Sequence, residues 1–532
     1  MMKKIIKKLL AALLAVAMVC AMAIPAFAGT EGDITTWHSF SAFQIFTGNV
    51  EGNVSNDFKI SNVAWGSNIA DDAAAFLDQL KSADTIGPLF ANAHSAQDVL
   101  EVISQWKDSD ANSIAFARFV CHYLYPNANA NPTPAVTGGS DALTFNEAGY
   151  YLIVDTTPFN HGDFDHAYNS FLLKVTKANW REPITPKAEK PSVEKKVFDN
   201  QDGTSTGVFG SSADHAINEK FQFQLTATLP ASTDHAYDYY DTYAVCFKDT
   251  LSQGITYDGL DSVVIESKGN PGNRYDITDS STIDISKLES QNYFEVNIAD
   301  VRKCADAAEL DLNAGATITV TYTAHLNDNA YVNTGSGSTE NKNSVQLQYS
   351  NNPRPGEYWG TTPKSEVYVF TYQLNNTKRA EKEDGTPLPG AGFRLYSDKD
   401  CTQEVKLYQK DNFYFPIKDA TDKKAVEEMY SDKDGKFNIK GLDAGTYYLK
   451  ETKTPDDYSV CADKEIVISA THDVNHVSLS GNLSTTIINK KAGGITLPST
   501  GGIGTTLFYV VGGGLMVAAI VLLVTKKRME NK

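Results

Sequence analysis

The sequence places a lysine, an asparagine and an acid where β-strands would turn their side chains inward. If KPSVEKKVF (residues 190–198) is a strand, Lys195 shares an apolar face with two valines. Asn343 alternates with apolar residues in NSVQLQYS, and Asp249 does the same in YAVCFKDTL. The same three residue types recur in this register later in the chain, at Lys378, Glu451 and Asn489.

Such a set of residues could form a covalent bond. Burial favours the neutral forms of a lysine and an acid, because an unpaired buried charge costs several kcal/mol. A neutral amine beside a carboxamide can attack its carbon and expel ammonia, while a protonated acid donates to the carboxamide oxygen and moves protons. The product would be a Lys–Asn isopeptide bond.

A bond from Lys195 to Asn343 would close a loop of about 148 residues. By analogy with a disulfide, it would stabilise the fold by roughly 5 kcal/mol in the chain-entropy model. Alternation alone leaves a second interpretation open, in which the lysines reach water at sheet edges and the asparagines and acids lie in caps and turns.

Two regions contain the strands that would position these residues. Between about 188 and 372, runs such as FQFQLTATL and TITVTYTAHL alternate and are separated by clusters of Gly, Asn, Asp and Ser. Residues 373–492 show the same alternating pattern in FRLYSD and TYYLKET. Each region predicts an antiparallel β-sandwich.

The preceding region, residues 29–187, has a mixed pattern. Apolar spacing predicts helices over 71–81 and 96–125, and alternation predicts strands over 149–155 and 170–177. The segment PITPKAEKP, with three prolines, predicts a boundary or linker before the first sandwich.

Both ends of the chain carry targeting signals. Residues 1–28 combine four lysines, an apolar run and Ala-Phe-Ala before Gly29, which is typical of a cleaved secretory signal peptide. Near the other end, the apolar run 505–524 is long enough to span a bilayer and is followed by a basic tail. Everything between these segments is therefore expected outside the cell.

Charge and cysteine content narrow the possible partners. The net charge of −18 argues against nucleic acid. We expect no metal and no cofactor, because no ligand spacing stands out. Five cysteines remain after signal cleavage, and pairing within each region predicts two disulfides and leaves Cys121 free. The predicted pairs are Cys246 with Cys304 and Cys401 with Cys461.

The chain resembles the major (backbone) pilin subunits of Gram-positive bacteria, which class C sortases assemble. HSFSAFQIFTGNVEG and AGYYLIVD resemble the first domain of that family, and FKDTLSQGITY and ENKNSVQLQYSNNP resemble its isopeptide-forming middle domain. LPGAGFRLYSD and YYLKETKTP resemble the collagen-adhesin B-type module with its E-box. The resemblance implies tandem immunoglobulin-like sandwiches, the first domain with added helices. It also implies that Glu451 is the E-box glutamate and that Lys378 bonds to Asn489.

The motif LPSTG has the position of a sortase sorting signal in residues 493–532. Its residues are Leu497, Pro498, Ser499, Thr500 and Gly501. The resemblance implies that a sortase cleaves between Thr500 and Gly501 and holds Thr500 as an acyl enzyme. The acceptor would be a peptidoglycan amine for wall anchoring, or a lysine of the next subunit for a pilus.

Lys187 is the expected acceptor lysine, because it follows Trp180 between the first two domains as the family motif requires. The motif differs from the family pattern at Thr185, which leaves Lys190 as an alternative, and either lysine could simply be solvated. Whether the first domain carries its own bond stays open.

Three functions are considered for this chain. The resemblance favours a covalent pilus shaft, whose partners would be a class C sortase, copies of the chain, minor pilins, peptidoglycan and host ligands. A monomeric wall-anchored adhesin or minor subunit would share the sorting signal but would not need Lys187. A surface enzyme is disfavoured, because the sequence shows no nucleophile constellation.

Overall fold

The computed structural model describes residues 39–51, 59–107, 110–139, 142–157, 167–168, 171–175, 180–183, 188–200, 207–355, 359–480 and 483–492. The predicted signal peptide, Lys187, the LPSTG motif and the apolar run 505–524 lie outside these residues. Within the described ranges, no helix combines the length and apolar character needed to cross a membrane.

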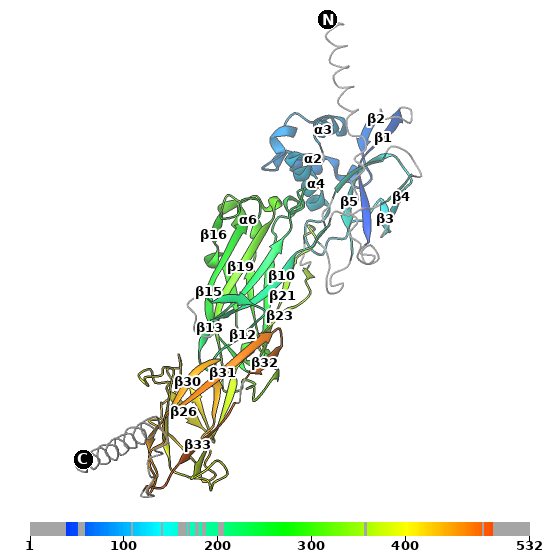
Figure 1. Ribbon diagram of the computed structural model, residues 1–532. Helices are drawn as coiled ribbons and strands as arrows, with labels where there is room; N and C mark the ends of the chain where they lie inside the picture. The colour runs from blue at the N-terminus through cyan, green and yellow to red at the C-terminus, as the bar shows by residue number, and fades with distance from the viewer. Residues whose placement is uncertain are drawn as a thin grey trace, which may run out of the picture.

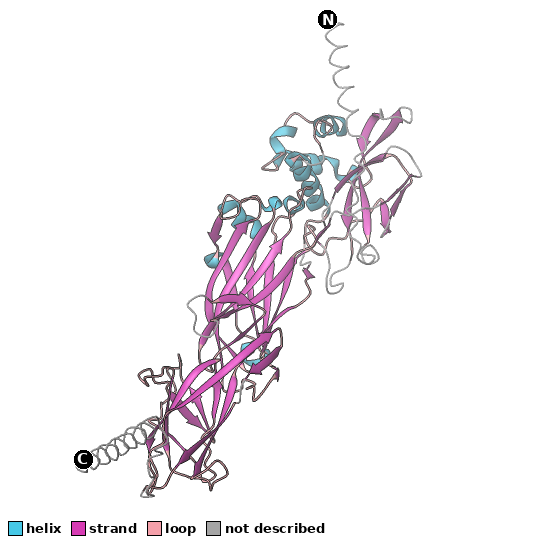
Figure 2. Cartoon of the chain, in the orientation of Figure 1, coloured by secondary structure: helices cyan, strands magenta, loops and turns pink. Residues whose placement is uncertain are grey.

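The molecule is an elongated row of three parts, with the N-terminal unit at one end and the strand β33 at the other (Figure 1). Most helices gather in the N-terminal unit and at the adjacent end of the next part; one more short helix lies nearer the C-terminal part, and the remainder is strand and loop (Figure 2). The mainly β fold class predicted from the sequence is confirmed.

The N-terminal unit packs three helices against a five-stranded sheet in the order β2-β1-β5-β7, with β3 on β1. Its helices are α2 (Ala73–Ser82), α3 (Ala96–Ile103) and α4 (Ala111–Leu124). Its strands are β1 (Phe40–Glu51), β2 (Lys59–Trp65), β3 (Val136–Gly139), β4 (Ala142–Phe145), β5 (Gly149–Asp155), β6 (Ala167–Tyr168), β7 (Phe171–Val175), β8 (Trp180–Pro183) and β9 (Ala188–Glu189).

The strands predicted at 149–155 and 170–177 are confirmed as β5 and β7. The single helix predicted over 96–125 is wrong, because α3 ends at Ile103 and α4 begins at Ala111. The segment between them is polar apart from Trp106, and the Asp110 carboxylate accepts a hydrogen bond from the Lys107 backbone N–H at 2.9 Å. Local bonds of this kind compete with a continuous helix.

The middle sandwich has two sheets. The first has the order β11-β10-β13-β19-β15-β16, and the second β12-β23-β21-β14-β18-β17 with β22 on β21. The strands of the first sheet are β10 (Ser192–Asp199), β11 (Val208–Gly210), β13 (Lys220–Leu229), β15 (Ile255–Ser267), β16 (Arg274–Asp276) and β19 (Ala316–Leu326). Those of the second are β12 (Ser212–Asp214), β14 (Val245–Leu251), β17 (Ser281–Asp284), β18 (Tyr293–Ile298), β21 (Lys342–Ser350), β22 (Trp359–Thr361) and β23 (Ser365–Phe370). Two short helices, α5 (Leu288–Gln291) and α6 (Val301–Ala307), complete this part.

Alternation builds the core of this sandwich. Along β13, every second side chain is buried, including Phe221, Phe223 and Leu225, and the intervening residues are more exposed. The inward faces of the two sheets form one continuous apolar cluster. A polar residue on such a face is therefore enclosed by both sheets.

The C-terminal sandwich also has two sheets, in the orders β20-β32-β31-β30-β25-β28 and β26-β27-β29-β24-β33. The first contains β20 (Gly337–Ser338), β25 (Gly392–Tyr396), β28 (Met429–Tyr430), β30 (Gly445–Lys453), β31 (Lys464–Asp473) and β32 (His476–Ser480). The second contains β24 (Tyr372–Ala380), β26 (Leu407–Lys410), β27 (Phe413–Pro416), β29 (Ile439–Leu442) and β33 (Ser484–Asn489). β24 and the last strand, β33, are parallel neighbours.

The two sandwiches meet without a linker. One residue, Thr371, separates β23 from β24; it is fully buried, and its hydroxyl donates to the Leu442 carbonyl at 3.1 Å. The Ile217 backbone N–H of the middle sandwich donates to the Gly441 carbonyl at 2.9 Å. Gly441 has a φ of +81°, and a Cβ there would lie 2.5 Å from the Ile217 side chain. Only glycine permits this close approach.

Candidate isopeptide sites

The first candidate site lies in the core of the middle sandwich. Lys195 extends from β10 in one sheet, while Asp249 on β14 and Asn343 on β21 belong to the facing sheet. Lys195 is 3% exposed, and the other two side chains are fully buried. The sequence prediction that all three point inward is confirmed, so the interpretation as edge and turn residues is wrong here.

A tyrosine joins the three residues. Lys195 Nζ donates to Asp249 Oδ2 and, at 3.1 Å, to the Tyr322 hydroxyl. That hydroxyl donates to Asp249 Oδ1 at 3.1 Å and accepts from Asn343 Nδ2 at 2.5 Å. Asn343 Oδ1 has no hydrogen-bond partner among the described residues.

Burial shifts the protonation of this site towards neutral groups. It lowers the pKa of Lys195 to about 8, an effect that the Asp249 carboxylate partly opposes. Burial also raises the pKa of Asp249, again opposed by the lysine. The two shifts favour transfer of a proton from the amine to the acid relative to water. The pKa of Tyr322 is raised well above its usual value by burial and by the Asp249 charge, so its hydroxyl keeps its proton.

The second candidate site lies in the core of the C-terminal sandwich. Lys378 on β24 and Asn489 on β33 come from neighbouring strands of one sheet, and Glu451 on β30 faces them from the other. Lys378 is fully buried, and Asn489 and Glu451 are 1% and 5% exposed. The predicted inward orientation is confirmed for this set as well.

Here lysine, asparagine and acid contact one another directly. Lys378 Nζ donates to Asn489 Oδ1 and lies 3.2 Å from Glu451 Oε1. Asn489 Nδ2 donates to the same carboxylate oxygen at 2.7 Å. The other oxygen of Glu451 accepts from the Cys461 backbone N–H at 2.9 Å, which fixes the carboxylate. The amine therefore touches the amide that it would attack and the acid that would carry the proton.

The sequence did not predict that Tyr322 and Cys461 contact the two candidate sites. Tyr322 follows the inward alternation of TITVTYTAHL, so the pattern could have shown its position but not its contacts. The Cys461 Sγ atom lies 3.6 Å from Lys378 Nζ, and burial raises the pKa of this thiol to about 11. Its loop gives no periodic signal.

The predicted disulfides are wrong, since all five cysteines of the described residues are free thiols. Cys246 alternates with the inward residues of β14 and stays outside the sandwich core, whereas Cys304 packs within it. Cys461 faces Lys378, while Cys401 contacts the Asp463 carboxylate at 3.7 Å. Each pair has its sulfur atoms in different surroundings.

Of the two acceptor candidates, Lys190 is exposed just before β10, and Lys187 lies outside the described residues.

Comparison with known families agrees with the organisation of the C-terminal half. Residues 375–482 match the SpaA family, described as a prealbumin-like fold domain. Residues 489–531 match the LPXTG cell wall anchor motif, which confirms the predicted sorting signal.

Individual relatives are more distant. The chain is 24% identical over 290 residues to the trypsin-resistant surface T6 protein of Streptococcus pyogenes serotype M6; the match covers 52% of this chain and 45% of the T6 protein, less than half its length. The solved T6 backbone pilin of the same organism has a TM-score of 0.45 at 16% identity, over 86% of this chain and 96% of that one. The full-length major pilin SpaD from Corynebacterium diphtheriae has a TM-score of 0.40 at 19% identity, over 65% and 80% of the two chains.

The domain match and the anchor motif lie next to each other, in the order expected from the resemblance to backbone pilins. The chain is a secreted, cell-wall-anchored surface protein of the Gram-positive type that carries a SpaA prealbumin-like domain.

Proposed function

We propose that this chain is the shaft subunit of a covalent surface pilus. A class C sortase would join Thr500 of one subunit to a lysine of the next, and each subunit would stiffen itself with internal isopeptide bonds. The observation that carries the proposal is the burial of a lysine, an asparagine and an acid in the core of each of two successive sandwiches. The elongated row of parts and the anchor motif support it (Figure 1).

Each internal bond would form by one substitution at a carboxamide. The neutral lysine Nζ attacks the asparagine Cγ, and the protonated acid donates to the carboxamide oxygen. The tetrahedral intermediate then expels the amide nitrogen as ammonia, with the protons coming from the amine through the acid. The new amide carries no charge, so the core no longer holds an ion pair. One ammonia leaves for each bond.

The two bonds would have different structural effects. A bond from Lys195 to Asn343 would join the two sheets of the middle sandwich through its core. A bond from Lys378 to Asn489 would join β24 to the last strand, β33, through residues that are 111 apart in sequence.

Removal of the Tyr322 hydroxyl is expected to slow formation of the middle bond. The Tyr322→Phe variant keeps the ring in the core but loses the contacts that hold amine, acid and amide together, and such misplacement can cost up to about 100-fold in rate. In an Asn489→Ala background, where only the middle bond alters the mass, cell-free synthesis followed by mass spectrometry over time measures the rate. Tyr257→Phe is the matched control, because this ring packs 5.6 Å from the Tyr322 ring in the same core. Crosslinking of Tyr322→Phe at the control rate would contradict the role.

The pilus itself is tested with wall extracts released by muramidase and boiled in detergent. Cells with the wild-type chain should give a high-mass ladder on a blot, and Lys187→Ala should collapse it to a single anchored band. Lys190→Ala is the control and should keep the ladder. Collapse of the ladder in Lys190→Ala alone would show that Lys190 is the acceptor. A single band in every strain would show that the chain is a monomeric adhesin.

A further inference from the structure

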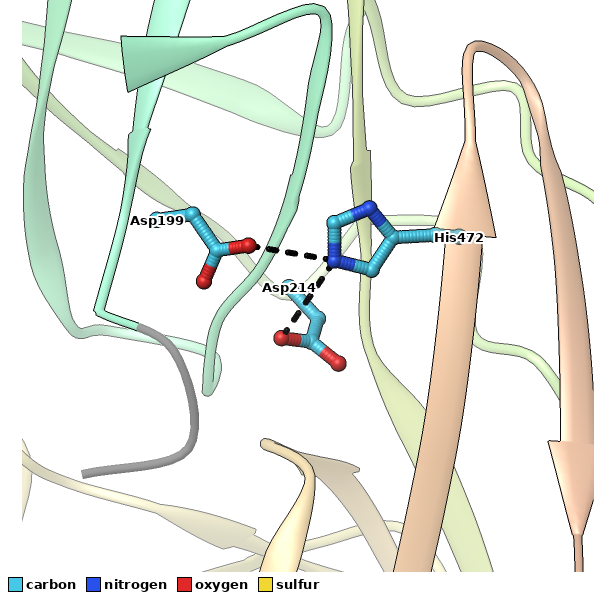
Figure 3. A group of neighbouring side chains, drawn as sticks. All are labelled: Asp199, Asp214 and His472. Carbon is cyan, nitrogen blue, oxygen red and sulfur yellow. Dashed lines mark ion pairs between the residues drawn. The ribbon is translucent and has the colours of Figure 1, made fainter. Parts of the chain in front are cut away.

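The junction between the middle and C-terminal sandwiches contains two neighbouring groups of histidine and carboxylate side chains. In the first, His472 Nε2 lies 3.2 Å from Asp199 Oδ2 and 3.9 Å from Asp214 Oδ1 (Figure 3). Its other ring nitrogen lies 2.8 Å from the Ser212 hydroxyl. Both nitrogens of this imidazole are engaged, so the group is an internal ion-pair cluster.

The second group consists of His215, Glu219 and Asp443, whose potential ligand atoms all lie within 4.8 Å of one another. His215 Nε2 lies 2.7 Å from the Phe198 carbonyl oxygen. Because a carbonyl can only accept, Nε2 carries the proton and Nδ1 presents a lone pair. The ring is 1% exposed, and its Nδ1 has no hydrogen-bond partner among the described residues. A buried, unpartnered nitrogen therefore belongs to a group that also contains two carboxylates.

The fold holds this second group in place from both sides. The His215 backbone N–H donates to the Phe370 carbonyl at 3.0 Å, and its ring stacks on Phe221 with 4.1 Å between centroids. Asp443 lies two residues after Gly441 in the sequence. The contact of Gly441 with Ile217 brings the two sandwiches together. The ligands thus come from different sandwiches but are fixed by one packed junction.

The two carboxylates of this group are held by nearby donors. Lys418 Nζ lies 3.6 Å from Glu219 Oε2 but is about half exposed, so solvent screens much of its charge. Two hydrogen bonds reach the Asp443 carboxylate, from the Ala444 backbone and from Asn200. These donors hold both carboxylates in the group that contains the buried imidazole.

We propose that His215, Glu219 and Asp443 bind one divalent transition cation of the Zn²⁺ class and thereby clamp the two sandwiches together. One imidazole nitrogen and two carboxylate oxygens suit Zn²⁺, whereas Ca²⁺ and Mg²⁺ prefer oxygen ligands alone. The bond from the other ring nitrogen to a backbone carbonyl is the usual support of a metal-binding histidine.

The test uses the mature chain with its anchor segment, purified in detergent, stripped with a chelator and dialysed against Zn²⁺. We expect one zinc per chain and a higher unfolding temperature with the metal. Glu219→Gln and Asp443→Asn should each weaken zinc binding by more than about 100-fold, because loss of a supporting partner alone costs about 10–100-fold. Glu219→Gln keeps an oxygen to accept from the Ala216 backbone, so it is the variant that best preserves the fold.

His472→Gln is the matched control, since it alters the neighbouring group and leaves the three proposed ligands intact. It should bind zinc like the wild type, and the visible spectrum of the Co²⁺-loaded protein should change in Glu219→Gln but not in His472→Gln. Absence of retained zinc in the wild type would overturn the proposal. So would unchanged affinity in both ligand variants, or loss of zinc in His472→Gln alone.

Discussion

The ectodomain (residues 29–492) with Asp249→Ala is expected to retain one more ammonia than the wild-type ectodomain, each measured against the mass of its own sequence. It should also unfold with roughly 5 kcal/mol less stability, the chain-entropy value for a loop of this length. The substitution removes the carboxylate that contacts Lys195 Nζ directly and that the Tyr322 hydroxyl links to the Asn343 amide. Intact-mass spectrometry and urea unfolding measure the two effects.

The Asn343→Ala variant separates the effect of losing the bond from the effect of losing the acid. It should show the same mass difference, because it has no carboxamide, but it keeps the contact between Lys195 and Asp249. Asp249→Ala should therefore be the less stable of the two, since it leaves a buried amine without its carboxylate. A wild-type ectodomain with its full unmodified mass would end the proposal for both sandwiches.

The second large effect is expected from Glu451→Gln in the C-terminal sandwich. The glutamine can still accept from the Cys461 backbone, but it cannot act as an acid towards the Asn489 carboxamide. The variant should retain one more ammonia and lose about 5 kcal/mol of stability, the chain-entropy value for a loop of 111 residues. Its β33 should exchange its amide hydrogens faster, because the ladder to β24 and the core packing of Ile487 then hold this edge strand without a covalent bond.

Thr454→Ala is the control for this second variant. Its hydroxyl lies 3.5 Å from Glu451 Oε2 but touches neither the amine nor the amide. The control should therefore lose the same ammonia as the wild type and keep β33 protected. Equal protection of β33 in Glu451→Gln would show that the strand does not depend on the bond.

The two buried sets of lysine, asparagine and acid could be predicted from the sequence because β-strand alternation is a local property. A period of two assigns Lys195 and Asn343 to inner faces without knowledge of the partner strand. The anchor motif is also local, and its match confirmed it. Alternation also predicted the strands that carry the sets, such as β10 and β14.

Features that depend on contacts between distant segments could not be predicted. Cysteine counting paired Cys246 with Cys304, although Cys246 lies on strand β14 outside the core cluster and Cys304 packs into that cluster from helix α6. The group of His215, Glu219 and Asp443 forms only because two sandwiches dock, and no spacing in the sequence records that contact. The break between α3 and α4 depends on local polar bonds that apolar periodicity does not report.

The single buried residue between β23 and β24 determines how a fibre of such subunits would respond to load. With only Thr371 to connect them, the two sandwiches have no spare length of chain about which to swing. Sideways force on one sandwich passes directly into the strands of the other, as shear across hydrogen-bonded ladders. The middle and C-terminal sandwiches should therefore bend as one rigid unit, whose bending stiffness depends on their combined length.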